Sequence, residues 1–356
     1  MEYTSLTIDS ALAGEPRARV MIIYTGGTIG MARNSFGVLM PFNFSHILEH
    51  LPTLRNLQLQ LVVTSFVNPI DSSDIEPRHW QAIGEIIEKH YSTQNGFVVL
   101  HGTDTMAYTA SAVAFMLQNL SKPVVFTGAQ LPISELRSDA RENLITALEV
   151  ASTIREGVAR VPEVCVCFGG TLIRGCRAKK VESMHFDAFQ SENYPLLATA
   201  GVAIKYDDRA IQLAGTAKLH VLKRFDTGVA ILKLYPGITA EIVAPVVRNP
   251  GIKALILESY GSGNAPTAAW FVGMLGEAIQ AGLLVLNISQ CPGGMVVQGK
   301  YETSRGLKEV GVISGSDMTV EAAVTKLMLL IGEYGVEAAK LRISSSMAGE
   351  MSARSS

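Results

Sequence analysis

Short apolar runs rich in β-branched residues recur along the first half of the chain, with helical patterns between them. Five runs are predicted strands: Val20–Tyr24, Leu61–Phe66, Phe97–Leu100, Val124–Thr127 and Val164–Phe168. A continuous apolar run is typical of a strand that is buried on both faces of a parallel sheet. The intervening helical patterns, such as Arg78–His90, predict right-handed βαβ units. The first half therefore predicts an α/β domain built on a parallel sheet.

A polar, irregular segment separates this pattern from a second alternation of strands and helices. The later predicted strands are Val229–Leu234, Ala254–Leu257 and Leu283–Ile288. We therefore expect two unequal α/β domains. The predicted division is a flexible lead-in at residues 1–18, a larger N-terminal domain at 19–205, a connecting segment at 206–227 and a smaller C-terminal domain at 228–350.

Composition argues against several classes of partner. The net charge of −2, without any basic cluster, is unlike that of a nucleic-acid-binding surface. No run approaches the ~18 uninterrupted apolar residues of a membrane-spanning helix. Cys165 and Cys167 lack the second cysteine pair or histidine pair of a zinc site, and four cysteines are too few for a disulfide framework. We expect a cytoplasmic protein without metal or cofactor that binds neither nucleic acid nor membrane.

Four polar segments each follow a predicted strand of the first domain: Thr25–Met31, Asp71–Asp74, Gly102–Thr105 and Gly169–Lys180. Because the carboxyl ends of parallel strands share one edge, these segments are predicted to converge on one crevice. It would hold hydroxyl groups, acids and a base, namely Thr25, Thr28, Ser72, Ser73, Thr103, Asp71, Asp104 and Lys180 or Lys179. The sequence has no phosphate-binding P-loop or dinucleotide fingerprint. The segments therefore predict a catalytic or small-molecule site.

Each candidate residue also has a purely structural interpretation. Thr28 either completes a tight turn or acts as a nucleophile once a neighbouring group accepts its proton. Asp104 or Thr103 can cap the following helix, and Asp71 with the two serines can form a turn. Lys180 is either a surface lysine or, if buried beside an acid and a threonine, part of a proton relay. Spacing alone leaves these alternatives open.

Three motifs resemble those of the bacterial-type L-asparaginases, on their cytoplasmic, type I branch. They are Thr25-Gly26-Gly27-Thr28-Ile29-Gly30, Asp71-Ser72-Ser73-Asp74 and His101-Gly102-Thr103-Asp104-Thr105-Met106. The resemblance extends from about Arg19 to Glu350, nearly the whole chain. It implies a larger flavodoxin-like N-terminal domain and a smaller C-terminal α/β domain. It also implies a homodimer or homotetramer, with the active site near the partner subunit.

The resemblance implies an amidohydrolase that converts L-asparagine to L-aspartate and ammonia through a threonine-bound β-aspartyl intermediate. Thr28 would be the nucleophile, and Thr103, Asp104 and Lys180 would form a second catalytic group. Asp104 would also hold the substrate ammonium. Asp71, Ser72 and Ser73 would bind the amino-acid head group. The alternatives are a sensor that binds asparagine or aspartate without turnover, and an ammonia-releasing subunit of a tRNA-dependent amidotransferase.

The sequence departs from the family pattern in two places. Val38 stands where the family usually has a tyrosine in the loop after the nucleophile. Asn264 and Cys291 match positions of a second, activating asparagine site, whereas Glu258 and Lys179 replace the arginine and threonine expected there. Because a Glu258–Lys179 pair can fill that pocket, we expect no activation by asparagine.

Overall fold

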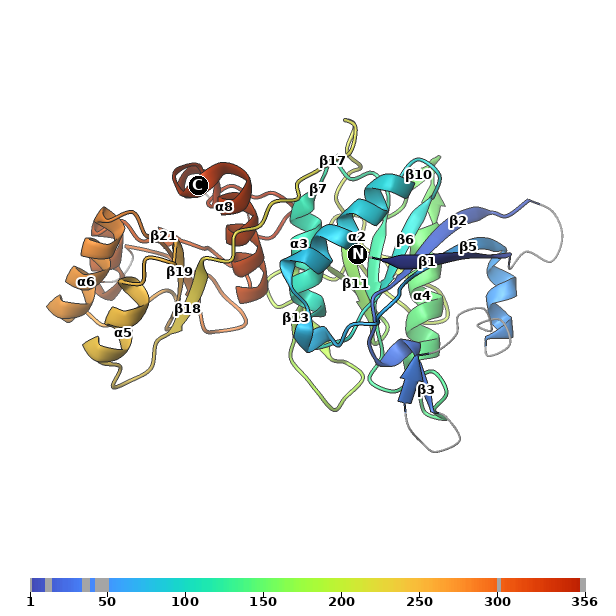
Figure 1. Cartoon of the computed structure of the whole chain (residues 1–356), viewed down its shortest axis with the longest axis horizontal. Helices are drawn as coiled ribbons and strands as arrows, with labels where there is room; N and C mark the ends of the chain where they lie inside the picture. The colour runs from blue at the N-terminus through green and yellow to red at the C-terminus, as the bar shows by residue number, and fades with distance from the viewer. Residues whose placement is uncertain (1, 10–14, 34–38, 42–50, 300–301, 353–356) are drawn as a thin grey trace. The chain divides into compact units, whose positions relative to one another are not determined.

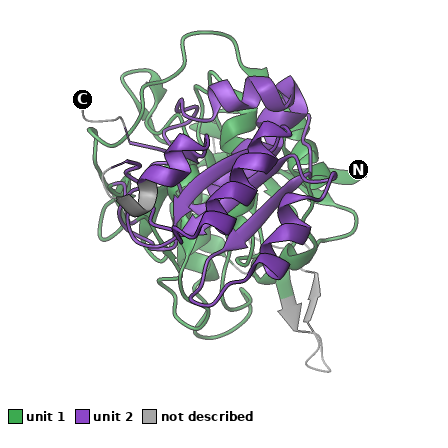
Figure 2. Cartoon of the chain, turned by 90° about the vertical axis from the view of Figure 1, so that its left-hand side faces the viewer, with its two compact units in different colours: residues 1–191, 195–221 green, residues 192–194, 222–356 purple. Residues whose placement is uncertain are grey.

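The computed structural model describes residues 2–9, 15–33, 39–41, 51–299 and 302–352. The chain forms two compact units, which Figure 2 shows in different colours. Unit 1 comprises residues 1–191 and 195–221, and unit 2 comprises residues 192–194 and 222–356. Each unit contains its own sheet with helices packed on it, so the predicted fold of two unequal α/β parts is confirmed.

A nine-stranded sheet forms the centre of unit 1. Its order is β1-β5-β2-β6-β8-β11-β12-β15-β16. The strands are β1 (Tyr3–Asp9), β2 (Ala18–Tyr24), β5 (Leu59–Phe66), β6 (Gly96–Leu100), β8 (Val124–Thr127), β11 (Val164–Phe168), β12 (Thr171–Arg174), β15 (Ala198–Thr199) and β16 (Lys205–Tyr206). The five predicted strands pair in parallel as β5-β2-β6-β8-β11. In chain order this is 2-1-3-4-5, the flavodoxin-like arrangement.

The N-terminal segment differs from our expectation of a flexible lead-in. Residues Tyr3–Asp9 form β1, which pairs antiparallel with β5 along its whole length. Ile8 is buried, and Ser5 bonds across the strands to Thr64 at 2.9 Å between their hydroxyl oxygens. The alternation of apolar and hydroxyl residues fits an edge strand with one covered face. The lead-in prediction is therefore wrong for these seven residues.

Three helices of unit 1 connect the parallel strands: α2 (Pro77–His90), α3 (Met106–Met116) and α4 (Ala140–Ser152). The helical pattern predicted at Arg78–His90 is α2, which begins with Pro77 at its first position and a reciprocal capping box between Glu76 and His79. Its apolar stripe is buried, including Trp80 and Ile83. α3 is buried along nearly its whole length, which explains why its sequence shows little periodicity.

The connection through α4 has the opposite hand from the other two. Along the chain, β5, β6, β8 and β11 follow one another across the sheet in one direction, apart from the step past β2. Connections of one hand would then place all their helices on one face. Helices α2 and α3 pack together, whereas α4 packs on β2, β6 and β8 from the other face (Figure 1). Our expectation of right-handed units throughout is therefore wrong for β8–α4–β11.

Short elements complete unit 1. They are η1 (Thr28–Gly30), β3 (Met31–Arg33), β4 (Leu39–Pro41), η3 (Pro52–Leu57), η4 (Ser72–Asp74), β7 (Leu117–Gln118), β9 (Ile154–Arg155), β10 (Val158–Ala159), η5 (Gly175–Arg177), β13 (Lys179–Lys180), β14 (Phe189–Gln190) and β17 (His220–Val221). Three of them, η1, η4 and β13, carry candidate site residues.

Unit 2 has a four-stranded parallel sheet in the order β18-β19-β20-β21. Its elements are β18 (Val229–Lys233), α5 (Ala240–Val247), β19 (Ala254–Ser259), α6 (Ala269–Gln280), β20 (Leu284–Ser289), α7 (Glu302–Glu309), β21 (Ile313–Ser314) and α8 (Val320–Arg342). Phe271 and Leu275 of α6 pack with Leu255 and Leu257 of β19 in the core. No helix among the described residues has both the length and the apolar character needed to cross a membrane.

A buried ion pair fixes the C-terminal segment of unit 2. The Lys326 ammonium donates to Glu350 Oε1 at 2.6 Å, and neither side chain is exposed. The same ammonium donates to the carbonyls of Ile343 and Ser345 at 2.8 and 2.7 Å. Glu350 also accepts from the backbone N–H groups of Met347 and Ala348. Both charges are thus fully hydrogen-bonded, as a buried pair requires.

Candidate active site

The candidate residues gather where the order of the parallel strands reverses. From β2 the chain moves to β5 on one side, and later to β6 on the other side of β2. In open α/β sheets, ligands bind outside the carboxyl ends of the strands at such a point. Thr25–Gly30 follows β2, and Gly102–Thr105 follows β6. The two threonine loops therefore leave adjacent strands at the switch point.

Close backbone packing joins the loops that carry Thr28 and Thr103. An ideal Cβ on Gly27 would lie only 2.5 Å from the backbone nitrogen of Gly102. An ideal Cβ on Gly102 would in turn lie 2.5 Å from Ser72 Oγ. Only glycine permits approaches this close, and Gly27 also has a φ of 87°. Three of the four predicted segments thus meet at Gly27 and Gly102.

Thr28 begins a single 3₁₀ turn, η1, whose N-cap is Gly27. The side chain of Thr28 is half-buried, whereas Ile29 and Gly30 after it are buried. The strand before the turn is fixed to its neighbours, because the Thr25 N–H and hydroxyl both donate to the carbonyl of Leu100 at 3.0 Å. A rigid strand end therefore leads directly into the turn that presents Thr28.

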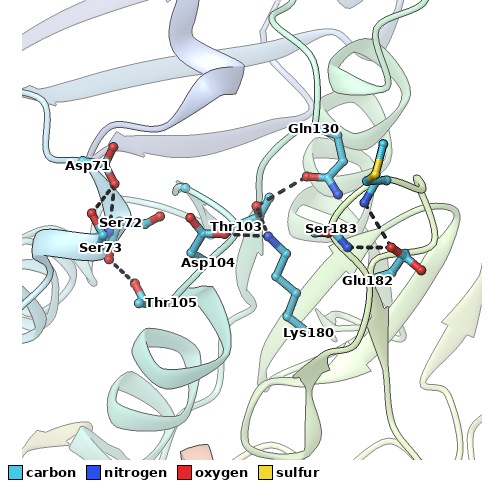
Figure 3. Close-up of polar contacts among 12 residues, drawn as sticks. Asp71, Ser72, Ser73, Thr103, Asp104, Thr105, Gln130, Lys180, Glu182 and Ser183 are labelled. Carbon is cyan, nitrogen blue, oxygen red and sulfur yellow. Dashed lines mark hydrogen bonds and ion pairs between the residues drawn. The ribbon is translucent and has the colours of Figure 1, made fainter.

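The Lys180 ammonium bridges the side chains of the neighbouring residues Thr103 and Asp104 (Figure 3). Its ammonium donates to Thr103 Oγ1 at 2.8 Å and to Asp104 Oδ1 at 2.7 Å. The Lys180 side chain is 17% exposed and that of Asp104 is 67% exposed. Lys180 is therefore not a solvated surface lysine, and the carboxylate keeps a side open to a ligand. Asp104 does not cap α3, since the N-cap residue of that helix is Thr105.

Asp71, Ser72 and Ser73 form a turn at the start of η4, beside the Thr103 loop (Figure 3). Asp71 Oδ1 accepts from the Ser73 N–H at 2.9 Å and from the Ser73 hydroxyl at 2.8 Å. These bonds, the backbone one first, lower the pKa of Asp71 below its ordinary value. Thr105 Oγ1 donates to the carbonyl of Ser72 at 2.6 Å, which ties the turn to the second threonine loop.

His101 has a structural environment in which both ring nitrogens are hydrogen-bonded. Its Nδ1 bonds the carbonyl of Gly102 at 2.7 Å, and its Nε2 bonds Thr109 Oγ1 at 3.0 Å. Trp80 Nε1 donates to the same hydroxyl at 3.1 Å. Complete burial lowers the pKa of His101 to about 4, so the ring is neutral near pH 7. A neutral ring that donates from Nδ1 and accepts at Nε2 satisfies all three partners.

Gln130 is a site residue that the sequence analysis missed. Its Oε1 accepts from Thr103 Oγ1 at 3.5 Å, and its Nε2 donates to the carbonyl of His185 at 3.1 Å. The backbone N–H of Gln130 is held by the carboxylate of Asp139. The available signal was its position three residues after β8, at the same sheet edge as the other loops.

Two predictions from the sequence concern residues outside this cluster of contacts. Val38, at the place of the family tyrosine, is outside the described residues. Lys179 belongs to unit 1, whereas Glu258, Asn264 and Cys291 belong to unit 2. The predicted Glu258–Lys179 pair therefore stays a prediction.

Comparison with known proteins identifies the family. Residues 19–212 match the family Asparaginase, N-terminal, and residues 228–342 match the Glutaminase/Asparaginase C-terminal domain. L-asparaginase 1 of Escherichia coli strain K12 is 42% identical over 335 residues, which cover 93% of this chain and 97% of that protein.

Two solved structures share the fold. L-asparaginase I from Vibrio cholerae has a TM-score of 0.86 and 36% identity, with 95% of this chain and 100% of that chain covered. The thermostable L-asparaginase from Thermococcus kodakarensis has a TM-score of 0.86 and 33% identity, with 94% and 100% covered. The chain therefore belongs to the asparaginase family, on its type I branch, and is a hydrolase that acts on linear amides.

Proposed function

We propose that this protein hydrolyses L-asparagine to L-aspartate and ammonia through an ester formed at Thr28. One observation carries the proposal: a largely buried lysine bridges a threonine and an aspartate on the loop whose glycine packs against the Thr28 loop. A structural role alone gives no reason to place an ammonium, a hydroxyl and an open carboxylate together at a switch point.

In the first step, Thr28 Oγ attacks the carbon of the side-chain amide. The C–O bond forms, the hydroxyl proton is passed toward the leaving nitrogen, and cleavage of the C–N bond releases ammonia. In the second step, water attacks the ester carbon, aspartate leaves and the Thr28 hydroxyl is restored. Backbone N–H groups of the two threonine loops stabilise the oxyanion in each step, each worth about 3 kcal/mol in other enzymes.

Thr103 and Lys180 move the protons in this scheme. Because Lys180 already donates to Thr103 Oγ1 at 2.8 Å, that hydroxyl can give its own hydrogen to another acceptor without losing a partner. Gln130 Oε1, 3.5 Å away, is the acceptor seen in the resting site. A positive charge next to Thr103 also stabilises negative charge that develops on its oxygen during proton transfer.

Two acidic groups and two serines bind the charged ends of the substrate. The open side of Asp104 would pair with the α-ammonium, and Asp71, Ser72 and Ser73 would hold the head group. Such a site selects amino acids because a substrate that lacks either charged end leaves the charged and polar groups facing that end without a partner. The similarity to L-asparaginases favours hydrolysis over the amidotransferase subunit, and a sensor would bind the same ligand without releasing ammonia.

We also propose that the protein is a cytoplasmic homo-oligomer, either a dimer or a tetramer. Three apolar side chains in the segment after Lys180 are exposed in the single chain: Val181 at 40%, Met184 at 86% and Phe186 at 41%. A second subunit that covers them would bury apolar surface next to the site. The molar mass in solution, measured by light scattering, tests this proposal, and a monomer at all concentrations would contradict it.

Ammonia release by wild type, Thr28→Ala and Thr93→Ala tests the reaction. Thr93 is a matched control because its hydroxyl, beyond the end of α2, donates to the carbonyl of His90 and accepts from Gln94 Nε2, and it takes no part in the proposed chemistry. We expect wild type and Thr93→Ala to release ammonia from L-asparagine, and Thr28→Ala to lose nearly all activity while it stays folded. Normal turnover by Thr28→Ala would disprove the assignment of the nucleophile. If the wild type binds asparagine but releases no ammonia, the protein is a sensor.

A further inference from the structure

Tyr24 is the last residue of β2 and is buried directly beneath the turn that carries Thr28. Its side chain is 2% exposed, and its hydroxyl donates to the carbonyl of Gly30 at 3.1 Å. An ideal Cβ on Gly30 would lie 2.2 Å from a ring carbon of Tyr24, so the ring packs directly against this glycine. The tyrosine therefore contacts the last residue of η1 both through its ring and through its hydroxyl.

The two ends of the turn are held in different ways. At its start, Gly26 packs against the backbone of Ile70, and Gly27 packs against that of Gly102. Within the turn, the Gly30 N–H donates to the carbonyl of Gly27 at 3.2 Å. At its end, the Tyr24 hydroxyl satisfies the buried Gly30 carbonyl. Thr28 lies between these anchors, so losing the second one leaves the end of the turn with only its own backbone bonds, from the Gly30 N–H to Gly27 and from the Met31 N–H to Thr28.

We propose that Tyr24 is a positioning residue for the reaction, because its hydroxyl fixes the Gly30 carbonyl and thereby the turn that presents Thr28. The inference rests on the proposed role of Thr28 as nucleophile. Tyr24 acts through the backbone and does not itself exchange a proton with the substrate. Its burial supports this, because desolvation raises the pKa of Tyr24 to about 12, so the hydroxyl stays a donor at neutral pH.

We expect a change at Tyr24 to displace Thr28 but not the groups proposed to hold the substrate. A displacement of a reacting group by about 1 Å costs on the order of a hundredfold in rate. The Asp71–Ser73 turn and Asp104 keep their own contacts when Tyr24 changes. Tyr24→Phe, which keeps the ring, should therefore lower kcat by roughly ten- to a hundredfold and leave KM within about twofold.

Tyr91→Phe is the matched control. The Tyr91 hydroxyl is also part-buried and accepts from the Ser121 N–H at 2.7 Å. Tyr91 follows α2 and precedes β6, so it lies at the amino end of the strands, away from the site. The control should lower the unfolding temperature at unchanged kcat. Between pH 6 and 9 the rate profile of Tyr24→Phe should run parallel to that of the wild type, since no titrating group is removed.

The outcomes separate this inference from the proposed function. Wild-type kcat in Tyr24→Phe, or a raised KM alone, would overturn the inference while an inactive Thr28→Ala variant still upholds the nucleophile. An active Thr28→Ala variant would overturn both. If Tyr24→Phe does not fold, Gly30→Ala provides the second test. It keeps the hydroxyl but pushes the ring away, and it should show the same fall in kcat at nearly constant KM.

Discussion

Replacement of Lys180 by methionine should lower kcat strongly and leave the free energy of unfolding nearly unchanged. The variant keeps an unbranched chain of similar length and removes the ammonium that donates to Thr103 at 2.8 Å and to Asp104 at 2.7 Å. Asp104 is 67% exposed, so the ion pair contributes at most about 1 kcal/mol to the free energy of unfolding. A positioned acid–base group contributes about 10²- to 10⁴-fold to rate, equivalent to about 3 to 5 kcal/mol of the activation barrier.

The assay compares kcat for L-asparagine with the urea midpoint of the same preparation. We expect Lys180→Met to lose at least about a hundredfold in kcat with an unfolding free energy within about 1 kcal/mol of the wild type. Lys253→Met is the matched control, because Lys253 pairs with Asp226 in unit 2 and takes no part in the proposed chemistry. A Lys180→Met variant as active as this control would refute the relay, whatever its stability.

Three further predictions concern His101, Glu350 and substrate saturation. Because the folded-state pKa of His101 is about 4 against an ordinary 6.5, its contribution to stability is present above pH 6.5 and is lost as the pH falls toward 4. The loss amounts to about 3 kcal/mol, and His101→Asn should show a correspondingly shallower pH dependence in urea unfolding. Glu350→Gln leaves the Lys326 ammonium buried without its counter-charge and should lower the free energy of unfolding by about 3 to 5 kcal/mol. An unchanged urea midpoint would contradict a stabilising role for the buried pair. Initial rates should rise hyperbolically with asparagine, and sigmoidal kinetics abolished by Cys291→Ser would contradict the absence of activation.

The central strands and the loops after them could be predicted because their signals are local. A buried parallel strand is a continuous apolar run, and the polar residues that follow it mark its carboxyl end. Val164–Phe168 and Val124–Thr127 were predicted with the bounds that the structure shows. The antiparallel strands β12, β15 and β16 were missed, because each is short and none is a continuous apolar run.

The contacts within the site could not be read from the residues alone. Lys180 lies 77 residues from Thr103, and it reaches the loop only because the chain returns from β12 through η5 to β13. Gln130 was missed although it follows a predicted strand, because a lone amide carries no chemical signature. The hand of the α4 connection was mispredicted because the rule used describes the common case. Tertiary packing, not local propensity, decides each of these features.

Direct detection of an ester at Thr28 tests the central claim most closely. Protein mixed with L-asparagine would be quenched in acid within milliseconds, digested, and its peptides measured by mass spectrometry. We expect an added aspartyl group on the peptide that contains Thr28, more of it during turnover than after the substrate is exhausted. Thr28→Ala should show none. An aspartyl group on another residue, or rapid ammonia release from Thr28→Ala under the same conditions, would contradict the account.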